Sequence, residues 1–422
     1  MQSQVPARRE TGPPVHRIPL AMLLLPLYYP LMTSPYEHAS CPYFSSGTCG
    51  SCTLLGIEAG KRIATKEGIV LKALADRGVT PRTVEPIRVP KSPWGTRCKT
   101  KVSVTGTIDT PTLGIVRSDL SSQDLSACPL TPLHVQELFI TLKEIIKEAN
   151  LIPYNIQERT GELKNIIVMN NHDASEGILR FVLRSTEAIP RVKKTIMNLQ
   201  RKHPGLTVVS CNIQPIPAAI LEGPEEVVLT EVRSIDVQYN DISLTFMPQS
   251  FIQVTHEVAG ALYHRAASYV RENSFSHALD LFCGVGGFSL SIASSVPRIT
   301  GVEVSPMAVE SARHSAARLS ASHASFFADD VEAFLSRSLT HEPDLVIVNP
   351  PRRGLSEGIR KRLLELKPTA ILYSSCDPQT FSRDVSEWMK DYELVSVSPF
   401  DMFPMTDHCE VLGILERKSV ND

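Results

Sequence analysis

Ala278-Leu-Asp-Leu-Phe-Cys-Gly-Val-Gly-Gly287 is the stretch that decides the fold of this 422-residue chain. Its first half is a short apolar run of the kind found in buried strands, and its glycines open the helix that follows. Further strand patterns alternate with helical patterns at 298–304, 325–330, 344–351, 370–373, 393–397 and 411–415. Strands this apolar, spaced by helices, predict a doubly wound α/β fold whose parallel sheet is covered on both faces.

The loop after the first strand indicates a nucleotide-like cofactor, because the ligand of such a sheet lies at the carboxyl ends of its strands. Gly284, Gly286 and Gly287 let the backbone approach the cofactor closely, and Glu303 can bind both hydroxyls of the cofactor's ribose. This pattern suits NAD as well as S-adenosylmethionine, although the pyrophosphate motif Gly-x-Gly-x-x-Gly is not met. Asn349-Pro350-Pro351 adds a rigid turn where a cofactor and a planar base can meet, and it is equally an ordinary strand terminator.

Cys376 is the candidate nucleophile. It follows the strand pattern at 370–373 and precedes a helix start, with Asp377 as N-cap and Pro378 at the first helical position. A thiol there points off the carboxyl edge of the sheet, and the partial positive charge of a helix N-terminus favours the thiolate. The alternative is a buried structural cysteine.

Glu410, at the start of the last strand, is the candidate base, with a cap or an ion pair as the alternative. The pair suits one reaction. A thiolate that adds to carbon 6 of uracil turns the ring into an enolate, whose carbon 5 can attack the methyl of a sulfonium donor. A carboxylate must then remove the proton from carbon 5 so that the thiolate can leave.

Five motifs, in this order, resemble the RNA uracil-5-methyltransferase family. They are Gln249-Ser-Phe-Ile-Gln253, Asp280-Leu-Phe-Cys-Gly-Val-Gly-Gly287, Asn349-Pro-Pro-Arg-Arg-Gly354, Ser374-Ser-Cys376 and His408-Cys-Glu410. The resemblance covers nearly everything from Cys41 onward, although Asn349 stands where several relatives carry Asp. The chain is most similar to the short 23S rRNA enzymes of the family. The segments that carry this are Gly161-Glu-Leu-Lys164, Arg180-Phe-Val-Leu-Arg-Ser185 and Asn212-Ile-Gln-Pro215.

The resemblance implies a class I, Rossmann-like, S-adenosylmethionine-dependent enzyme that methylates carbon 5 of a specific uridine in 23S rRNA. It implies Cys376 as the nucleophile and Glu410 as the base. It places Gln253, Phe282, Glu303 and Asn349 around S-adenosylmethionine, with Asp330 near the adenine. Phe251 matches a family aromatic close to the target base, where a ring can stack on a flipped base; core packing is the alternative.

A separate cysteine set lies near the N-terminus: Cys41, Cys49 and Cys52, with Cys128-Pro129 much later. Four thiolates can hold zinc or an iron–sulfur cluster, and the spacing alone does not separate these metals, although proline after the fourth cysteine favours iron–sulfur. Nine cysteines is an odd number, which disfavours a disulfide framework. The resemblance implies a 4Fe–4S cluster on these four residues.

The composition is that of a large enzyme, with 42% hydrophobic and 21% charged residues, but a net charge of −2 does not indicate a nucleic-acid binder. Arg97, Lys99 and Lys101 alternate along a strand-like run, which predicts one basic face for RNA or an ordinary solvated face. The resemblance implies 23S rRNA as partner, with neither DNA nor membrane. We expect a cytoplasmic monomer.

We expect four segments: a disordered or over-extended start, an iron–sulfur segment completed by Cys128, an α+β central RNA-binding domain and the catalytic domain. Their limits are 1–35, 36–90, 91–240 and 241–422. The apolar run from Ile18 to Met32 is broken by prolines and too short to span a membrane. A signal peptide is the alternative, but no clear small-residue cleavage site follows the run, so we expect an over-extended start with Met32 as the initiator. Rival functions are methylation of a tRNA uridine or another 23S rRNA uridine, an amino-methyltransferase, and an iron–sulfur redox protein with a dinucleotide domain.

Overall fold

The structure is a computed structural model that describes residues 41–217, 220–337 and 341–419. The predicted start at 1–35, with Met32 as initiator, lies outside the described residues. The described residues form one compact unit. Two large sheets organise the described part of that unit, and they are joined by the short hairpin of β9 (Ile235–Tyr239) and β10 (Ile242–Phe246).

The first sheet has eight strands in the order β1-β16-β17-β15-β14-β11-β12-β13. Their bounds are Thr83–Val84 (β1), Ala278–Leu281 (β11), Ile299–Glu303 (β12), Ala324–Ala328 (β13), Leu345–Val348 (β14), Ala370–Ser375 (β15), Tyr392–Phe400 (β16) and Glu410–Arg417 (β17). All neighbouring pairs are parallel except those of β17, which runs antiparallel to both β15 and β16. The predicted doubly wound sheet is confirmed.

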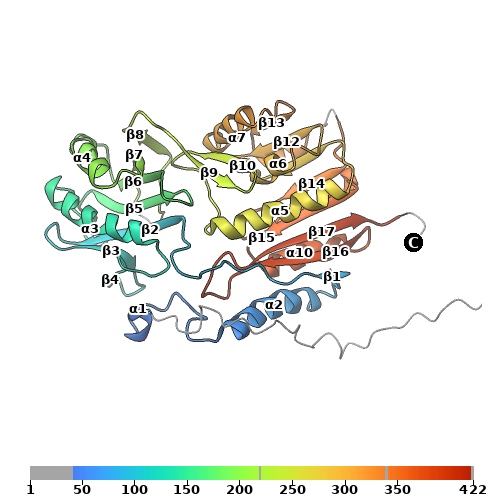
Figure 1. Ribbon diagram of the computed structural model, residues 1–422, viewed down its shortest axis with the longest axis horizontal. Coiled ribbons are helices and arrows are strands. Elements are labelled where there is room, and N and C mark those ends of the chain that lie inside the picture. Colours follow the sequence, from blue (N-terminus) through green and yellow to red (C-terminus); the bar gives the residue numbers. More distant parts are fainter. Residues whose placement is uncertain (1–40, 218–219, 338–340, 420–422) are drawn as a thin grey trace, which may run out of the picture. The chain divides into compact units, whose positions relative to one another are not determined.

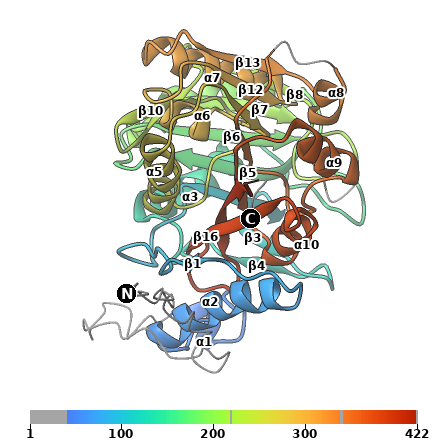
Figure 2. The same cartoon turned by 90° about the vertical axis from the view of Figure 1, so that its right-hand side faces the viewer.

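Helices cover both faces of this sheet, and Figure 2 shows α5 on one side with α9 and α10 on the other. One face packs on α5 (His256–Glu272), α6 (Gly287–Ser291) and α7 (Pro306–Arg318); the other packs on α8 (Val331–Leu335), α9 (Glu357–Leu366) and α10 (Pro378–Trp388). Alternate residues of β14 serve the two layers: Leu345 and Ile347 join one core, and Val346 and Val348 join the other. Period-two alternation of buried apolar side chains is what a sheet covered on both faces requires.

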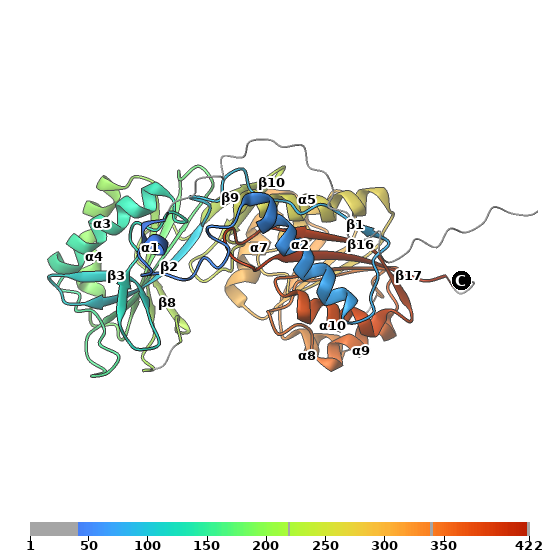
Figure 3. The ribbon, with the colours of Figure 1, turned by 90° about the horizontal axis from the view of Figure 1, so that it is seen from below.

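The helix α2 (Ala59–Ala75) also packs on the first sheet, over α10 and β16 (Figure 3). Its apolar side chains Val70, Ala73 and Leu74 are buried there. Just after α2, β1 adds a two-residue parallel strand beside β16. Residues 59–84, which the sequence assigned to the cysteine segment, therefore pack with the first sheet, because an amphipathic helix must bury its apolar side.

The second sheet has seven strands in the order β4-β3-β2-β5-β6-β7-β8, antiparallel except for the parallel pair β6–β7 (Figure 1). Its strands are Lys99–Gly106 (β2), Pro111–Val116 (β3), Ser122–Asp124 (β4), Leu163–Asn170 (β5), Gly177–Leu183 (β6), Leu206–Ile213 (β7) and Glu225–Val228 (β8). The helices α3 (Leu133–Glu148) and α4 (Ile189–Lys202) close a core on one face, and a four-residue helix α1 (Pro42–Ser45) precedes α2. Every residue of β5 and β6 is buried.

The helices of the described ranges include none with both the length and the apolar content needed to cross a membrane.

Candidate active site

The carboxyl ends of β11, β12 and β14 meet at one edge of the sheet and bring three predicted cofactor residues together. Phe282 follows β11 with a φ of 61°, Glu303 ends β12, and Asn349 follows β14. The Glu303 carboxylate accepts the backbone N–H groups of Gly284 at 3.2 Å and Ser305 at 3.0 Å, which fixes it beside the glycine loop. All three side chains are partly exposed, so a ligand at this edge can reach them.

A cavity of about 270 Å³ opens at the same edge. Phe282 and Asp330 both line it, with Pro351 and Arg353 from the loop after β14. Asp330 is exposed, and its Oδ1 accepts the N–H of Ala333 at 2.9 Å, so this side chain also caps α8. Phe282 and Asp330 thus face one shared space, and contact between Asp330 and an adenine stays a prediction.

Asp280 is a buried carboxyl at this edge that the sequence analysis did not select as a site residue. Its Oδ2 accepts from the Ser289 hydroxyl at 2.6 Å and from the Ser289 N–H at 3.1 Å, which ties β11 to α6. Burial raises the pKa of Asp280 to about 7, and Oδ1 has no hydrogen-bond partner among the described residues. An acid inside an apolar strand was the available signal, since unpaired carboxyls are seldom fully buried.

The segment 247–253 carries the other two residues predicted to contact a ligand, Gln253 and Phe251. Gln253 is buried, and its backbone carbonyl accepts from Cys98 Sγ at 2.8 Å. Phe251 is 64% exposed. Core packing is therefore excluded for Phe251, whose ring is free to stack on a partner, as the resemblance implies.

Cys376 lies between β15 and α10, half-buried at the carboxyl edge of the sheet. Burial, followed by the negative charge of Glu410, raises the pKa of Cys376 to about 11, against a lowering influence of Arg352. The expectation that the helix start favours thiolate is wrong for this structure. The Asp377 carboxylate already accepts the N–H groups of Gln379 and Thr380, so the positive end of α10 is compensated by the cap.

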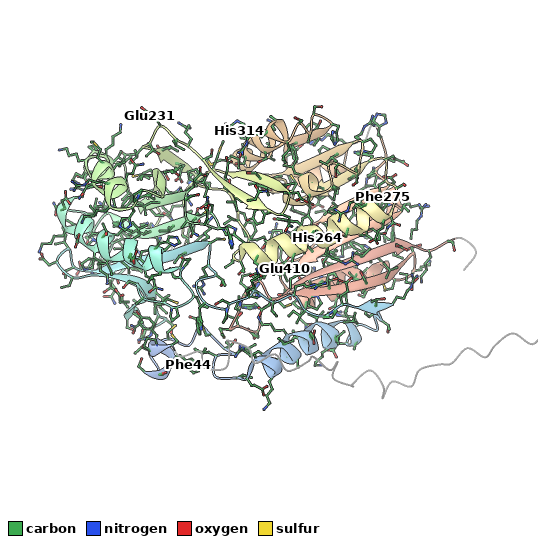
Figure 4. The ribbon with its side chains drawn as sticks, in the orientation of Figure 1. Phe44, Glu231, His264, Phe275, His314 and Glu410 are labelled. Atoms are coloured by element: carbon green, nitrogen blue, oxygen red, sulfur yellow. The ribbon has the colours of Figure 1, made fainter. Side chains whose placement is uncertain are left out.

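Glu410 begins β17 and is 2% exposed. Because β17 runs antiparallel to β15, the first residue of β17 lies beside the last residues of β15. This end of β17 faces the seven-stranded second sheet, which we call the central sheet (Figure 4). Burial raises the pKa of Glu410 to about 7, while a hydrogen bond from the Ser374 hydroxyl at 2.5 Å opposes the rise. No basic side chain pairs with Glu410 within the described ranges, so the ion-pair alternative does not hold there.

The first sheet therefore brings the thiol of Cys376 and the carboxyl of Glu410 together at its carboxyl edge, where the cavity beside Phe282 also opens. The charge of Glu410 is close enough to raise the pKa of Cys376, so the two groups can act on one small molecule. A carboxyl whose pKa is about 7 can exchange a proton at neutral pH, which is what general acid–base catalysis requires.

A model of the family described as tRNA (uracil-5-)-methyltransferase matches residues 226–418. The chain is 39% identical over 381 residues to the 23S rRNA (uracil(747)-C(5))-methyltransferase RlmC of Shewanella amazonensis, covering 90% of this chain and 98% of that protein. It is 37% identical over 392 residues to RlmC of Haemophilus influenzae, covering 90% and 99%. The chain belongs to the RNA uracil-5-methyltransferase family.

One solved structure shares the fold over most of the chain. It is a tRNA (uracil-54, C5)-methyltransferase from Pyrococcus abyssi in complex with S-adenosyl-L-homocysteine. The TM-score is 0.71 at 24% identity, covering 86% of this chain and 85% of that one. The family and the shared fold identify the cofactor class as S-adenosylmethionine, and the NAD alternative is set aside.

The basic residues predicted for RNA lie in two different surroundings in this family member. Lys99 and Lys101 sit on β2; Lys99 Nζ donates to the Ser250 carbonyl at 3.0 Å, and Lys101 Nζ lies 2.5 Å from a Glu222 oxygen. Burial lowers the pKa of Lys99 to about 8. Arg97 precedes β2, and its charge lowers the pKa of thiols in the cysteine set. A single basic face of three residues is not observed.

A buried arginine missed by the sequence analysis connects the central sheet to the loop of Phe251. Arg180, on β6, is fully buried and donates to Glu222 at 2.6 Å and to Glu226 at 2.9 and 2.6 Å. The carbonyl of Gly223, next to Glu222, accepts from Gln249 Nε2 at 3.3 Å. The motif Arg180-Phe-Val-Leu-Arg-Ser185 was noticed as a subgroup feature, but sequence alone does not reveal that its first residue is buried and paired.

The four predicted metal ligands come from two segments that meet. Cys41, Cys52 and Cys128 pack around one small apolar cluster with Leu130 and Met405. Burial, followed by the neighbouring Cys128, raises the pKa of Cys52 to about 11, with Cys49 and Cys41 also contributing. Within the described ranges, however, no three Cys, His, Asp or Glu side chains are grouped as ligands of a single metal ion.

The cysteine set also touches the loop that leads to Glu410. The Leu54 N–H donates to the Met405 carbonyl at 2.9 Å, and the Thr53 hydroxyl and the Asp407 N–H are 3.1 Å apart. Lys66 of α2 is 1% exposed; it forms an ion pair with Asp401 and donates to the Phe403 carbonyl at 2.9 Å. Hydrogen bonds and an ion pair from residues 53–66 therefore fix the segment 401–409 that precedes Glu410.

Proposed function

We propose that this enzyme transfers a methyl group from S-adenosylmethionine to carbon 5 of a specific uridine in 23S rRNA, of the uracil-747 type. The RlmC proteins, to which the chain is 37–39% identical over nearly their whole length, are named for that reaction. The observation that carries the mechanism is the convergence of Cys376 and Glu410 at the carboxyl end of β15.

In the proposed first step, Cys376, which is half-buried, gives its thiol proton to solvent water, and the thiolate sulfur then forms a bond to carbon 6 of the target uracil. The pair of electrons of the C5–C6 double bond moves towards the ring carbonyl, which makes an enolate. Arg352 is the nearby cation that favours the thiolate, against burial and the charge of Glu410. Because the pKa of Cys376 is about 11 in this structure, the reactive thiolate is a small fraction of the protein at neutral pH.

In the second step, carbon 5 of the enolate attacks the methyl carbon, and the sulfonium sulfur leaves with the bonding pair. Glu410 then takes the proton from carbon 5, the C5–C6 double bond re-forms, and the C6–S bond breaks with its electron pair returning to Cys376. Glu410 must begin this step as a carboxylate, and a group whose pKa is about 7 can lose its proton near neutral pH.

We assign Gln253, Phe282, Glu303 and Asn349 to S-adenosylmethionine, with Asp330 at the adenine. Phe282, Glu303 and Asn349 are supported by the shared edge of β11, β12 and β14, and Phe282 and Asp330 by the common cavity. Gln253 rests on the family motif alone. We assign Phe251 to stacking on the flipped uracil, because its ring is exposed beside buried Gln253. Lys99 and Lys101 are proposed RNA neighbours that act with the central sheet at 91–240, in a monomer located in the cytoplasm.

The test is methylation in vitro of 23S rRNA, and separately of tRNA, with labelled S-adenosylmethionine and mapping of the modified uridine. We expect the label on one 23S rRNA uridine and none on tRNA. Cys376→Ala should abolish transfer and keep cofactor binding, whereas Cys211→Ala, a buried cysteine of the central sheet, should retain activity. Label on tRNA alone would contradict the 23S rRNA assignment, and label on an exocyclic nitrogen would favour the amino-methyltransferase.

We also propose that Cys41, Cys49, Cys52 and Cys128 hold a 4Fe–4S cluster. The proposal rests on the family resemblance and on the meeting of the two cysteine segments, since Cys41, Cys52 and Cys128 pack on one apolar cluster and the other three thiols raise the pKa of Cys52. Anaerobic purification followed by iron and sulfide analysis should give about four of each per chain. Zinc in place of iron would contradict the proposal.

A further inference from the structure

Ser374 is a buried hydroxyl in direct contact with the proposed base. It is 0% exposed, and its Oγ donates to Glu410 Oε1 at 2.5 Å. The strand register explains the contact. Ser374 lies opposite Leu412 on β17, and Glu410 is two residues before Leu412, so Ser374 and Glu410 form a diagonal pair on one face of the sheet.

The contact matters because nothing else in the described residues donates to the carboxylate of Glu410. The side chain is 2% exposed, so water solvates it poorly. A hydroxyl that donates to a carboxyl oxygen stabilises the ionised form. With Oε1 held by Ser374, the second oxygen, Oε2, is left to receive a proton from a substrate at the carboxyl end of β15.

We propose that Ser374 is a positioning residue for the elimination step, which holds Glu410 as an oriented carboxylate through Oε1 and leaves Oε2 for the proton on carbon 5 of uracil. The inference rests on the proposed function. In this step the proton moves from carbon 5 to Oε2, the released pair forms the C5–C6 double bond, and the C6–S pair returns to Cys376. Ser374 keeps its own proton throughout.

Ser374→Ala removes the only described donor. Because a hydrogen bond to a charged group contributes about 1.5–3 kcal/mol in general, kcat should fall about 10- to 100-fold. The acid limb of the pH–rate profile should move about one to two pH units higher, since the carboxylate is harder to form. KM for RNA and for S-adenosylmethionine should stay within about twofold. Slower elimination after methyl transfer should also let the RNA–Cys376 adduct accumulate.

Ser398→Ala is the matched control. Ser398 on β16 also lies opposite Leu412, is 1% exposed, and its hydroxyl has no partner among the described residues. Its removal should leave kcat, the pH profile and the adduct level unchanged. If Ser374→Ala does not fold, Ser374→Cys keeps the volume with a weak donor and should move the acid limb in the same direction.

The wild-type enzyme, measured in parallel, separates this inference from the proposed function. If the wild type methylates uridine while the Ser374 variant keeps the wild-type acid limb and forms no extra adduct, the positioning role is overturned and the function stands. If the wild type transfers no methyl group to uridine, both are overturned.

Discussion

Glu410→Gln should change the pH dependence of stability in a way that follows from burial alone. Burial raises the pKa of Glu410 from 4.5 to about 7. The folded protein therefore holds this proton more tightly than the unfolded chain does. The resulting stabilisation is fully present below about pH 4.5 and is lost as the pH rises through about 7. The difference between the two pKa values corresponds to about 3 kcal/mol.

Glutamine keeps the shape of the side chain and can still accept the Ser374 hydrogen bond, but it carries no titrating proton. The variant should therefore gain up to about 3 kcal/mol of unfolding free energy over the wild type above about pH 8, and much less near pH 5. Urea unfolding of both proteins at these two pH values measures the difference. Glu310→Gln, on the exposed side of α7, is the control and should show no such pH-dependent gain.

An equal effect of Glu410→Gln at both pH values would refute the reasoning, because it would mean that Glu410 titrates alike in the folded and unfolded states.

Three further outcomes are expected. Glu410→Gln, given RNA and cofactor, should stall after methyl transfer; a denaturing gel should show a slow-migrating adduct through Cys376. Lys66→Met leaves Asp401 without its ion-pair partner, so urea unfolding should show a loss of about 3–5 kcal/mol; a loss under 1 kcal/mol would contradict the burial argument. Phe251→Ala should weaken RNA binding by about 1–3 kcal/mol in a filter assay; unchanged affinity would exclude stacking, and the melting temperature should hold, since the ring is exposed.

The catalytic fold was predictable because its strands are short apolar runs with clear ends. The expected strands at 298–304, 344–351 and 411–415 correspond to β12, β14 and β17, with boundaries that differ by one to three residues. Such local patterns determine elements, and the alternation of strands and helices restricts their topology.

The features that the sequence did not predict depend on packing between residues that are far apart in the chain. The sequence places residues 59–75 in the iron–sulfur segment, whereas in the fold they form α2, whose apolar side covers the first sheet. The sequence predicts that Asp377 caps α10, and the structure shows this cap. The pKa of Cys376 also depends on its burial and on the nearby charge of Glu410, and both follow only from the fold. Buried partners such as Ser374 and Arg180 leave no local signal, because a serine or arginine in a strand is usually solvated.

The most direct test of the central claim is to trap the covalent bond itself. RNA with fluorine in place of hydrogen at carbon 5 of the target uridine leaves no proton for Glu410 to remove, so the enzyme should stop with the methylated ring attached to sulfur. Mass spectrometry of the digested complex should find the nucleotide on Cys376, and Cys376→Ala should form no adduct. An adduct on another residue, or uridine methylation by Cys376→Ala at the wild-type rate, would contradict the account.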